Sequence, residues 1–314
     1  MVSVDNQELF QKYYQVEYDF NTASLTEEDI DNIKALVKEK RVDYGLAPIG
    51  EKIFEWIVEQ NENLRFELVD FDSEKIDALL YIPQSGFDKA YIVLNSKKPF
   101  VNQIFAAAHE YYHYIKDYEK IKREPYICNF AALQGVNEKR ACRFAAEFLL
   151  PEDALRMEIR RFKRNVLGSL ECKMAFENYA VVSMFLTMKY QVPLKAAMYR
   201  LYEEHYIENI EEYIQNYVFI KKVLQEVKIT EERVKPLYAC TNNYFTANSL
   251  IYRQMKLAYD AGYVSREEIL KDAERLGLDR ELIYEFFDEI TDIDEEEDDT
   301  ELMNYIQQMW RQES

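Results

Sequence analysis

Residues 105–115 of the chain are FAAAHEYYHYI, an apolar segment in which two histidines stand four positions apart. We expect this segment to lie in a helix that spans about residues 101–117. On an α-helix, residues four apart project from the same face, with their β-carbons roughly 5–6 Å apart. The imidazoles of His109 and His113 can therefore converge on one metal ion, at the roughly 2.0–2.1 Å that zinc requires.

Glu110 completes the pattern His-Glu-x-x-His. It is rotated off the axis that the two histidines share, so its carboxylate can take a proton from an attacking water and pass it to a leaving nitrogen. The alternative is that two histidines only cap a buried helix face. Because the chain has only three histidines, this spacing together with the glutamate has a chance on the order of a few in a thousand. The motif therefore predicts a catalytic metal site.

A catalytic zinc site has three protein ligands and one open position, so a third ligand must come from elsewhere in the chain. Residues 137–151, NEKRACRFAAEFLLP, supply the candidate. Alanines and phenylalanines form an apolar stripe along the helix predicted there, and Glu138 lies one turn before the stripe on the same face. Glu138 is the preferred third ligand, with Glu147 and Asp117 as alternatives.

Three short segments rich in branched and aromatic residues precede the motif helix and predict strands. They span residues 64–70, 76–82 and 90–94. Together with helices predicted from Thr26 to Tyr44 and from Pro48 to about residue 59, they indicate a small α+β layer. If the third strand lies at the edge of the sheet, it could bind a substrate peptide by strand addition.

Only helical patterns follow Pro151. The predicted helices span residues 152–164, 174–190, 194–204, 207–227, 244–262 and 265–276. Residues 177–207 resemble a helix-turn-helix, since one helix ends near Gln191 and Pro193 opens the next. Such pairs are also common as plain packing, and we expect no nucleic acid among the partners.

The composition predicts a soluble, cytoplasmic protein. Of the 314 residues 48% are hydrophobic, and the net charge of -19 repels phosphate backbones and anionic lipids at long range. The first thirty residues contain no apolar stretch of the kind found in signal peptides, and no window is apolar enough to span a bilayer. The four cysteines form no C-x-x-C pair, which argues against a disulfide framework.

Charge is distributed unevenly along the chain. Between Arg156 and Arg200 nine Lys or Arg residues stand against three Glu, whereas residues 285–301 contain eleven acids and no base. The two segments could bind each other or steer a partner, or they could form two solvated faces.

The two motifs together resemble the ImmA/IrrE-type metallopeptidases. HEYYH at residues 109–113 is followed, after 24 residues, by a segment of the form ExxAxxFAxxFLLP that begins at Glu138; the usual form in the family is HExxH and then ExxAxxFAxxLLMP. The strand YIVLN at residues 91–95 and the helical segment VVSMFLTMKYQVPLKAAMYRLY at residues 181–202 are similar to segments of the family. The resemblance covers about residues 45–207.

The resemblance implies a zincin-like fold in which His109, His113 and Glu138 bind Zn2+ and Glu110 is the catalytic base. It also implies a substrate class, because family members cleave helix-turn-helix repressors of prophages, mobile elements or stress responses. Cys142 stands where the family commonly has Asn, and we expect it to alter the support of the metal ligands. His205 is the remaining histidine, and its EEHY surroundings predict an exposed side chain.

These predictions divide the chain into five parts. They are an N-terminal helical segment at residues 1–44, a zincin-like metallopeptidase core at 45–151, a helical segment with the helix-turn-helix-like pair at 152–207, a C-terminal helical region at 208–290 and an acidic tail at 291–314.

The predicted function is that of a zinc metalloendopeptidase that cleaves one cytoplasmic protein, a helix-turn-helix transcriptional repressor. The alternative is a catalytically degenerate, metal-stabilised module that regulates or binds DNA or a repressor. A third hypothesis, a pure interaction scaffold, would depend on the acidic tail. Replacement of Glu110 by Gln separates the first two. In an enzyme it should leave zinc bound and abolish cleavage, whereas in a regulatory module it should leave function intact. The sequence does not indicate an oligomeric state.

Overall fold

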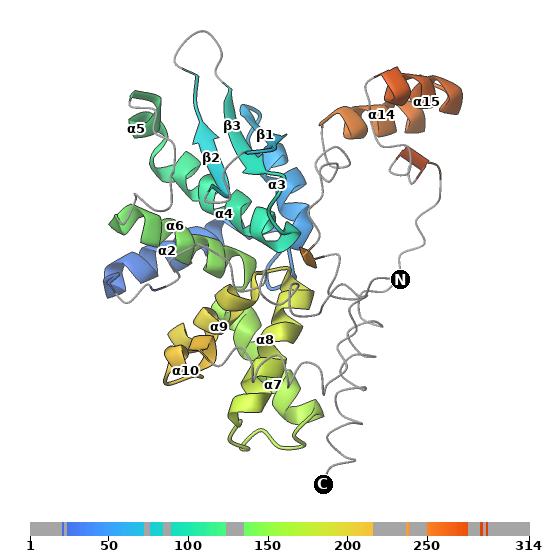
Figure 1. Ribbon diagram of the computed structural model, residues 1–314. Helices are drawn as coiled ribbons and strands as arrows, with labels where there is room; N and C mark the ends of the chain where they lie inside the picture. Colours follow the sequence, from blue (N-terminus) through green and yellow to red (C-terminus); the bar gives the residue numbers. More distant parts are fainter. Residues whose placement is uncertain are drawn as a thin grey trace, which may run out of the picture.

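The computed structural model describes residues 21, 24–71, 76–83, 89–123, 135–215, 237–238, 250–275, 283–284 and 287. The predicted acidic tail at residues 291–314 lies outside the described residues, as do Cys128 and Cys240. Within them the chain has a mixed α+β fold, with one small sheet and mostly helices, as the sequence predicts (Figure 1).

Three strands form the sheet, in the order β1-β3-β2. They are β1 (Leu64–Val69), β2 (Ala78–Tyr81) and β3 (Ala90–Asn95). The last strand is central, because it pairs in parallel with β1 and antiparallel with β2. Strand addition to this strand was expected only if it lay at the edge of the sheet, and this condition is not met, since both of its sides are already hydrogen-bonded within the sheet.

Part of the core lies between one face of this sheet and two helices. Alternate residues of β3, namely Ala90, Ile92 and Leu94, are fully buried. This is the period of two that a half-buried strand requires. Helices α3 (Ile53–Gln60) and α4 (Phe100–Lys116) pack against the sheet and against each other.

A second layer of helices covers α4. Helix α6 (Val136–Leu149) packs against α4, and α2 (Glu27–Lys40) packs against α6 (Figure 1). Thr26 and Asp29 form a capping box at the start of α2, in which each side chain binds the backbone amide of the other residue. Helix α5 (Tyr118–Arg123) follows α4 directly. No sequence pattern predicts this short helix.

The part of the chain after Pro151 is helical where it is described. The helices are α7 (Glu152–Asn165), α8 (Phe176–Tyr190), α9 (Leu194–Glu203), α10 (Ile210–Gln215), α14 (Leu250–Asp260) and α15 (Arg266–Arg275). Helices α8 and α9 pack against each other, joined through Gln191, which has a left-handed φ of 52°. The helix predicted at residues 207–227 lies outside the described residues beyond residue 215. Among the described helices none combines the length and the apolar character that crossing a membrane requires.

A buried cluster of charged residues joins α6 to α9. The guanidinium groups of Arg143 and Arg200, whose side chains are 2% and 1% exposed, lie 3.1 and 2.8 Å from the same oxygen of Glu147. Both arginines also bind Glu203, at 2.7 and 2.8 Å. Burial raises the pKa of Glu147 to about 7 even though Arg143 opposes this shift. The cluster fixes the position of α6 on the rest of the fold.

We predict that Arg200→Met lowers the free energy of unfolding by roughly 3–5 kcal/mol, because it leaves buried acidic groups with too little positive charge. Urea titration of the purified chain measures this quantity. The control is Lys97→Met, which removes an ion pair with Asp70 whose side chains are 54% and 63% exposed and should cost no more than about 1 kcal/mol. Equal effects of the two substitutions would contradict the role assigned to the cluster.

Candidate metal centre

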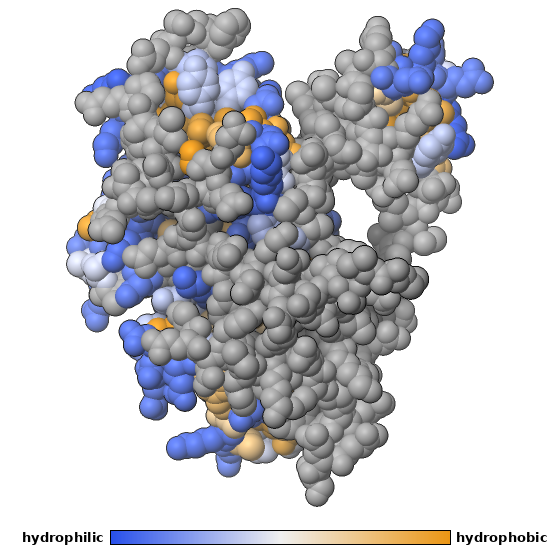
Figure 2. Space-filling model, in the orientation of Figure 1, coloured by the Kyte–Doolittle hydropathy of each residue, from blue (hydrophilic) through white to orange (hydrophobic). Residues whose placement is uncertain are grey.

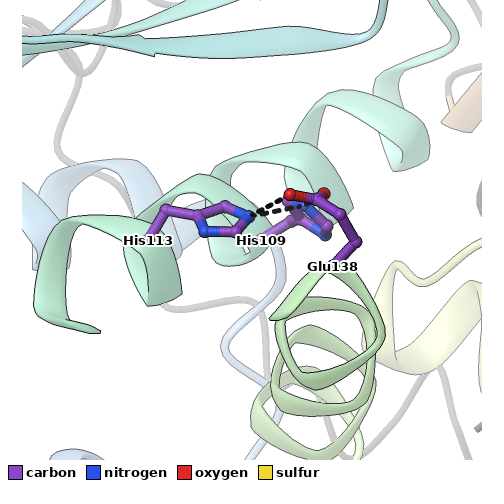
Figure 3. Close-up of side chains that lie close together, drawn as sticks. All are labelled: His109, His113 and Glu138. Carbon is purple, nitrogen blue, oxygen red and sulfur yellow. Dashed lines mark hydrogen bonds and ion pairs between the residues drawn. The ribbon is translucent and has the colours of Figure 1, made fainter. Parts of the chain in front are cut away.

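Two neighbouring helices supply the side chains of the predicted metal site. His109, Glu110 and His113 lie on α4 and are fully buried. Glu138 lies in the first turn of α6. The packing of α6 on α4 brings its carboxylate to the two imidazoles, and Figure 3 shows all three side chains pointing toward one another.

The distances between the three groups fit a tetrahedral metal ion. The Nε2 atoms of His109 and His113 lie 3.2 Å apart. One carboxylate oxygen of Glu138, Oε2, lies 3.2 Å from Nε2 of His109, and the other, Oε1, lies 3.3 Å from Nε2 of His113. Zinc bonds of roughly 2.0–2.1 Å at tetrahedral angles place ligand atoms about 3.3 Å apart. Two imidazole nitrogens and a carboxylate oxygen are also the donor types that zinc accepts, so these residues fit Zn2+.

The alternative third ligands lie elsewhere. Glu147 is engaged by the buried arginines of α6 and α9. Asp117 lies on the far side of the His113 ring, where its Oδ2 is 2.8 Å from Nδ1. A carboxylate in this position fixes the tautomer and the orientation of a metal-binding histidine. The sequence predicts Asp117 only as an alternative ligand, although its spacing of four from His113 places it on the same face of the helix.

The corresponding nitrogen of His109 has a different neighbour. Its Nδ1 lies 3.6 Å from the sulfur of Cys142, a buried cysteine on α6. Sulfur is a weak hydrogen-bond partner compared with the carboxylate at His113.

The contacts among the three predicted ligands shift the pKa of each in the metal-free chain. Burial alone would lower the pKa of His113, but hydrogen bonds to Asp117 and Glu138 raise it to about 10. Burial likewise opposes ionisation of Glu138, yet its bonds to the two histidines hold its pKa well below the usual range. Burial keeps the pKa of His109 below its ordinary value. A divalent cation would have to displace the His113 proton, as metal binding to histidine generally does.

Glu110 stands apart from this network. Within the described part of the chain neither of its carboxylate oxygens accepts a hydrogen bond of normal geometry, although the backbone of Leu80 on β2 lies nearby. Burial raises its pKa to about 7, against the opposing charge of His113. A carboxyl group that ionises near neutral pH is suited to general acid–base catalysis.

His205 does not join the buried centre. It follows α9 with a left-handed φ of 59° and is exposed, as its sequence surroundings predict.

A family comparison matches the part of the chain that contains this centre. The Peptidase_M78 family, described as the IrrE N-terminal-like domain, matches residues 60–202. The match runs from the last residue of α3 into α9 and includes both motifs, whereas α2 lies outside it. No curated protein matches the chain.

The raised pKa of Glu110 predicts how the stability of the metal-free chain depends on pH. As pH rises from the ordinary carboxyl value of 4.5 through about 7, the unfolded state loses its proton before the folded state does, so stability falls. With zinc removed by a chelator, Glu110→Gln should therefore be more stable than the wild type by roughly 3 kcal/mol at about pH 8.5, and the difference should shrink toward zero near pH 4.5.

Thermal or urea unfolding across this pH range measures the difference. The control is Glu119→Gln on α5, where the side chain is 73% exposed and no such trend is expected. A difference between Glu110→Gln and wild type that does not change with pH would show that Glu110 is not an unpaired buried acid.

Proposed function

Since residues 60–202 belong to the ImmA/IrrE-type peptidase family, we propose that the protein is a zinc metalloendopeptidase that cleaves a specific helix-turn-helix repressor. The observation that carries the proposal is the convergence of His109, His113 and Glu138, whose ligand atoms all lie within 4.8 Å of one another, beside the buried carboxylate of Glu110, whose oxygens accept no hydrogen bond of normal geometry within the described residues. A structural metal site would not need that fourth group.

The chemistry divides between the ion and the chain. When bound by these three residues, Zn2+ would act as a Lewis acid that polarises a peptide carbonyl. Glu110 would accept a proton from the attacking water and then donate it to the leaving nitrogen. In the metal-free chain its pKa is about 7, a value at which a carboxyl group can hold or release a proton near neutral pH.

The edge of the sheet suggests how a substrate would lie. The amide of Asn95 donates to the carbonyl of Asp77, so in this antiparallel ladder the backbone groups of Leu80 point away from β3. In the sheet that the described residues form, β2 is an edge strand. An extended peptide added along it would pass the Glu110 carboxylate, which lies beside Leu80.

The family resemblance supports the choice of a repressor as substrate. Cleavage confined to one protein partner is also what a cell requires of a peptidase in its cytoplasm. A segment of the repressor would have to adopt an extended conformation to add to β2, so an exposed linker is the expected target.

We predict that wild-type chain binds one zinc ion and that His113→Ala and Glu138→Ala each lose it, as metal analysis of purified protein at equal concentration would show. Glu110→Gln should keep the ion but cleave a helix-turn-helix repressor encoded by a neighbouring gene at least about 100-fold more slowly, because the proton acceptor is gone. The control is Glu119→Gln, which should cleave at the wild-type rate.

Two outcomes would overturn the proposal. Metal content that is indifferent to both ligand substitutions would remove the zinc site. Zinc binding with full biological function in Glu110→Gln would instead identify a metal-stabilised regulatory module.

A further inference from the structure

Helix α2 lies outside the matched residues 60–202, yet its first turn is bonded to the helix that carries Glu138. Asp29 on α2 binds Arg140 on α6 through one oxygen, Oδ1, which accepts from Nε at 2.9 Å and lies 2.8 Å from Nη2. Two contacts to one guanidinium group restrict its position more than a single contact would.

From Arg140 the bonds continue to the metal centre. Its Nη1 donates to the side-chain oxygen of Asn137 at 2.9 Å. The amide nitrogen of Asn137 donates to Oδ1 of Asp117 at 3.4 Å. The other oxygen of Asp117 lies 2.8 Å from Nδ1 of His113. A continuous path of polar contacts therefore joins α2 to a predicted zinc ligand.

Each link in this path constrains the next. Asn137 uses its oxygen toward Arg140 and its nitrogen toward Asp117, so its amide has one favourable orientation. Asp117 in turn has one oxygen on Asn137 and the other on His113, which fixes its rotation. Asn137 also directly precedes Glu138 in the first turn of α6. The same contacts therefore constrain two of the three predicted ligands, His113 and Glu138.

The far end of the path is itself anchored. The backbone amide and hydroxyl of Thr26 donate to Oδ2 of Asp29 at 3.1 and 2.9 Å. This leaves Oδ1 for Arg140. Because the capping box belongs to the first turn of α2, the position of Asp29 is set by the helix rather than by a loose side chain.

We propose that Asp29, Arg140 and Asn137 are positioning residues of the metal centre, and that α2 is thereby a working part of the peptidase unit. The proposal rests on the zinc site proposed above. Outer partners that orient metal ligands typically change metal affinity about 10–100-fold when they are removed.

The test is the dissociation constant of Zn2+ for the full chain, measured by competition with a chromophoric chelator. Arg140→Met and Asn137→Ala should each weaken zinc binding about 10-fold. Asp29→Asn should weaken it in the same direction. The double variant Asp29→Asn/Arg140→Met should be no weaker than Arg140→Met alone, because the two residues act in series.

Lys34→Met is the matched control. Lys34 also lies on α2 and binds Glu152 at 2.6 Å, with a side chain 34% exposed, against 35% for Arg140. Its ion pair is not connected to His113 by the path described. We expect the zinc affinity of Lys34→Met to stay within about twofold of wild type, even if this substitution lowers the unfolding temperature as much as Arg140→Met does.

The outcomes separate the two proposals. Wild-type zinc affinity in both Arg140→Met and Asn137→Ala, or an equal loss in Lys34→Met, would overturn the positioning role and leave the zinc site intact. Absence of zinc binding in wild type, or equal binding in His113→Ala, would overturn the zinc site and the positioning role with it. If Arg140→Met does not fold, Asn137→Ala alone decides.

Discussion

The packing of α6 against α4 is the contact on which the proposed function depends. His109 and His113 are brought together by the geometry of one helix, but Glu138 reaches them only because a second helix lies across the first. Aromatic side chains hold that crossing, since the ring centroid of Phe144 on α6 lies 5.4 Å from that of Tyr112 and 6.4 Å from that of Tyr111, both on α4. The apolar core therefore sets the geometry of the polar centre.

Burial gives this centre its chemical character. Ionisable groups in an apolar interior are costly unless each meets a partner of opposite charge or a hydrogen bond. The histidines and Glu138 satisfy one another, and the carboxylates of Asp117 and Glu138, on either side of the His113 ring, raise the pKa of this histidine. Among the described residues the Glu110 carboxylate accepts no hydrogen bond of normal geometry, and the charge of His113 offsets only part of the effect of burial on its pKa. Burial of this carboxyl group lowers the stability of the fold, but it produces a group that can exchange a proton near neutral pH.

Local patterns explain what the sequence could predict. The His-Glu-x-x-His spacing places three residues on α4 because helix geometry is set by neighbouring residues, and the three strands are recognisable from their branched and aromatic side chains. The order of the strands was not predictable, since pairing of β3 with both neighbours depends on how the chain crosses over. The contact between Asp29 and Arg140 spans 111 positions and has no local sequence signature. The sequence also does not predict that Asp117 orients His113, because this depends on which side of the imidazole ring Asp117 contacts.

Two polar systems of different kinds hold α6. Toward its middle and end, Arg143 and Glu147 are buried with Arg200 of α9, where low dielectric makes loss of one charge expensive for the whole fold. At its start, Arg140 is 35% exposed and its contact with Asp29 is worth little to stability by itself. The second system matters more for the orientation of His113 than for the stability of the fold, because small rotations of Asp117 change the direction in which the His113 nitrogen points. Arg200 of α9 lies inside the matched family segment, and α2 lies outside it. Contacts with both helices fix α6, which carries Glu138. The weaker of these contacts, between Arg140 and Asp29, is the one connected to His113.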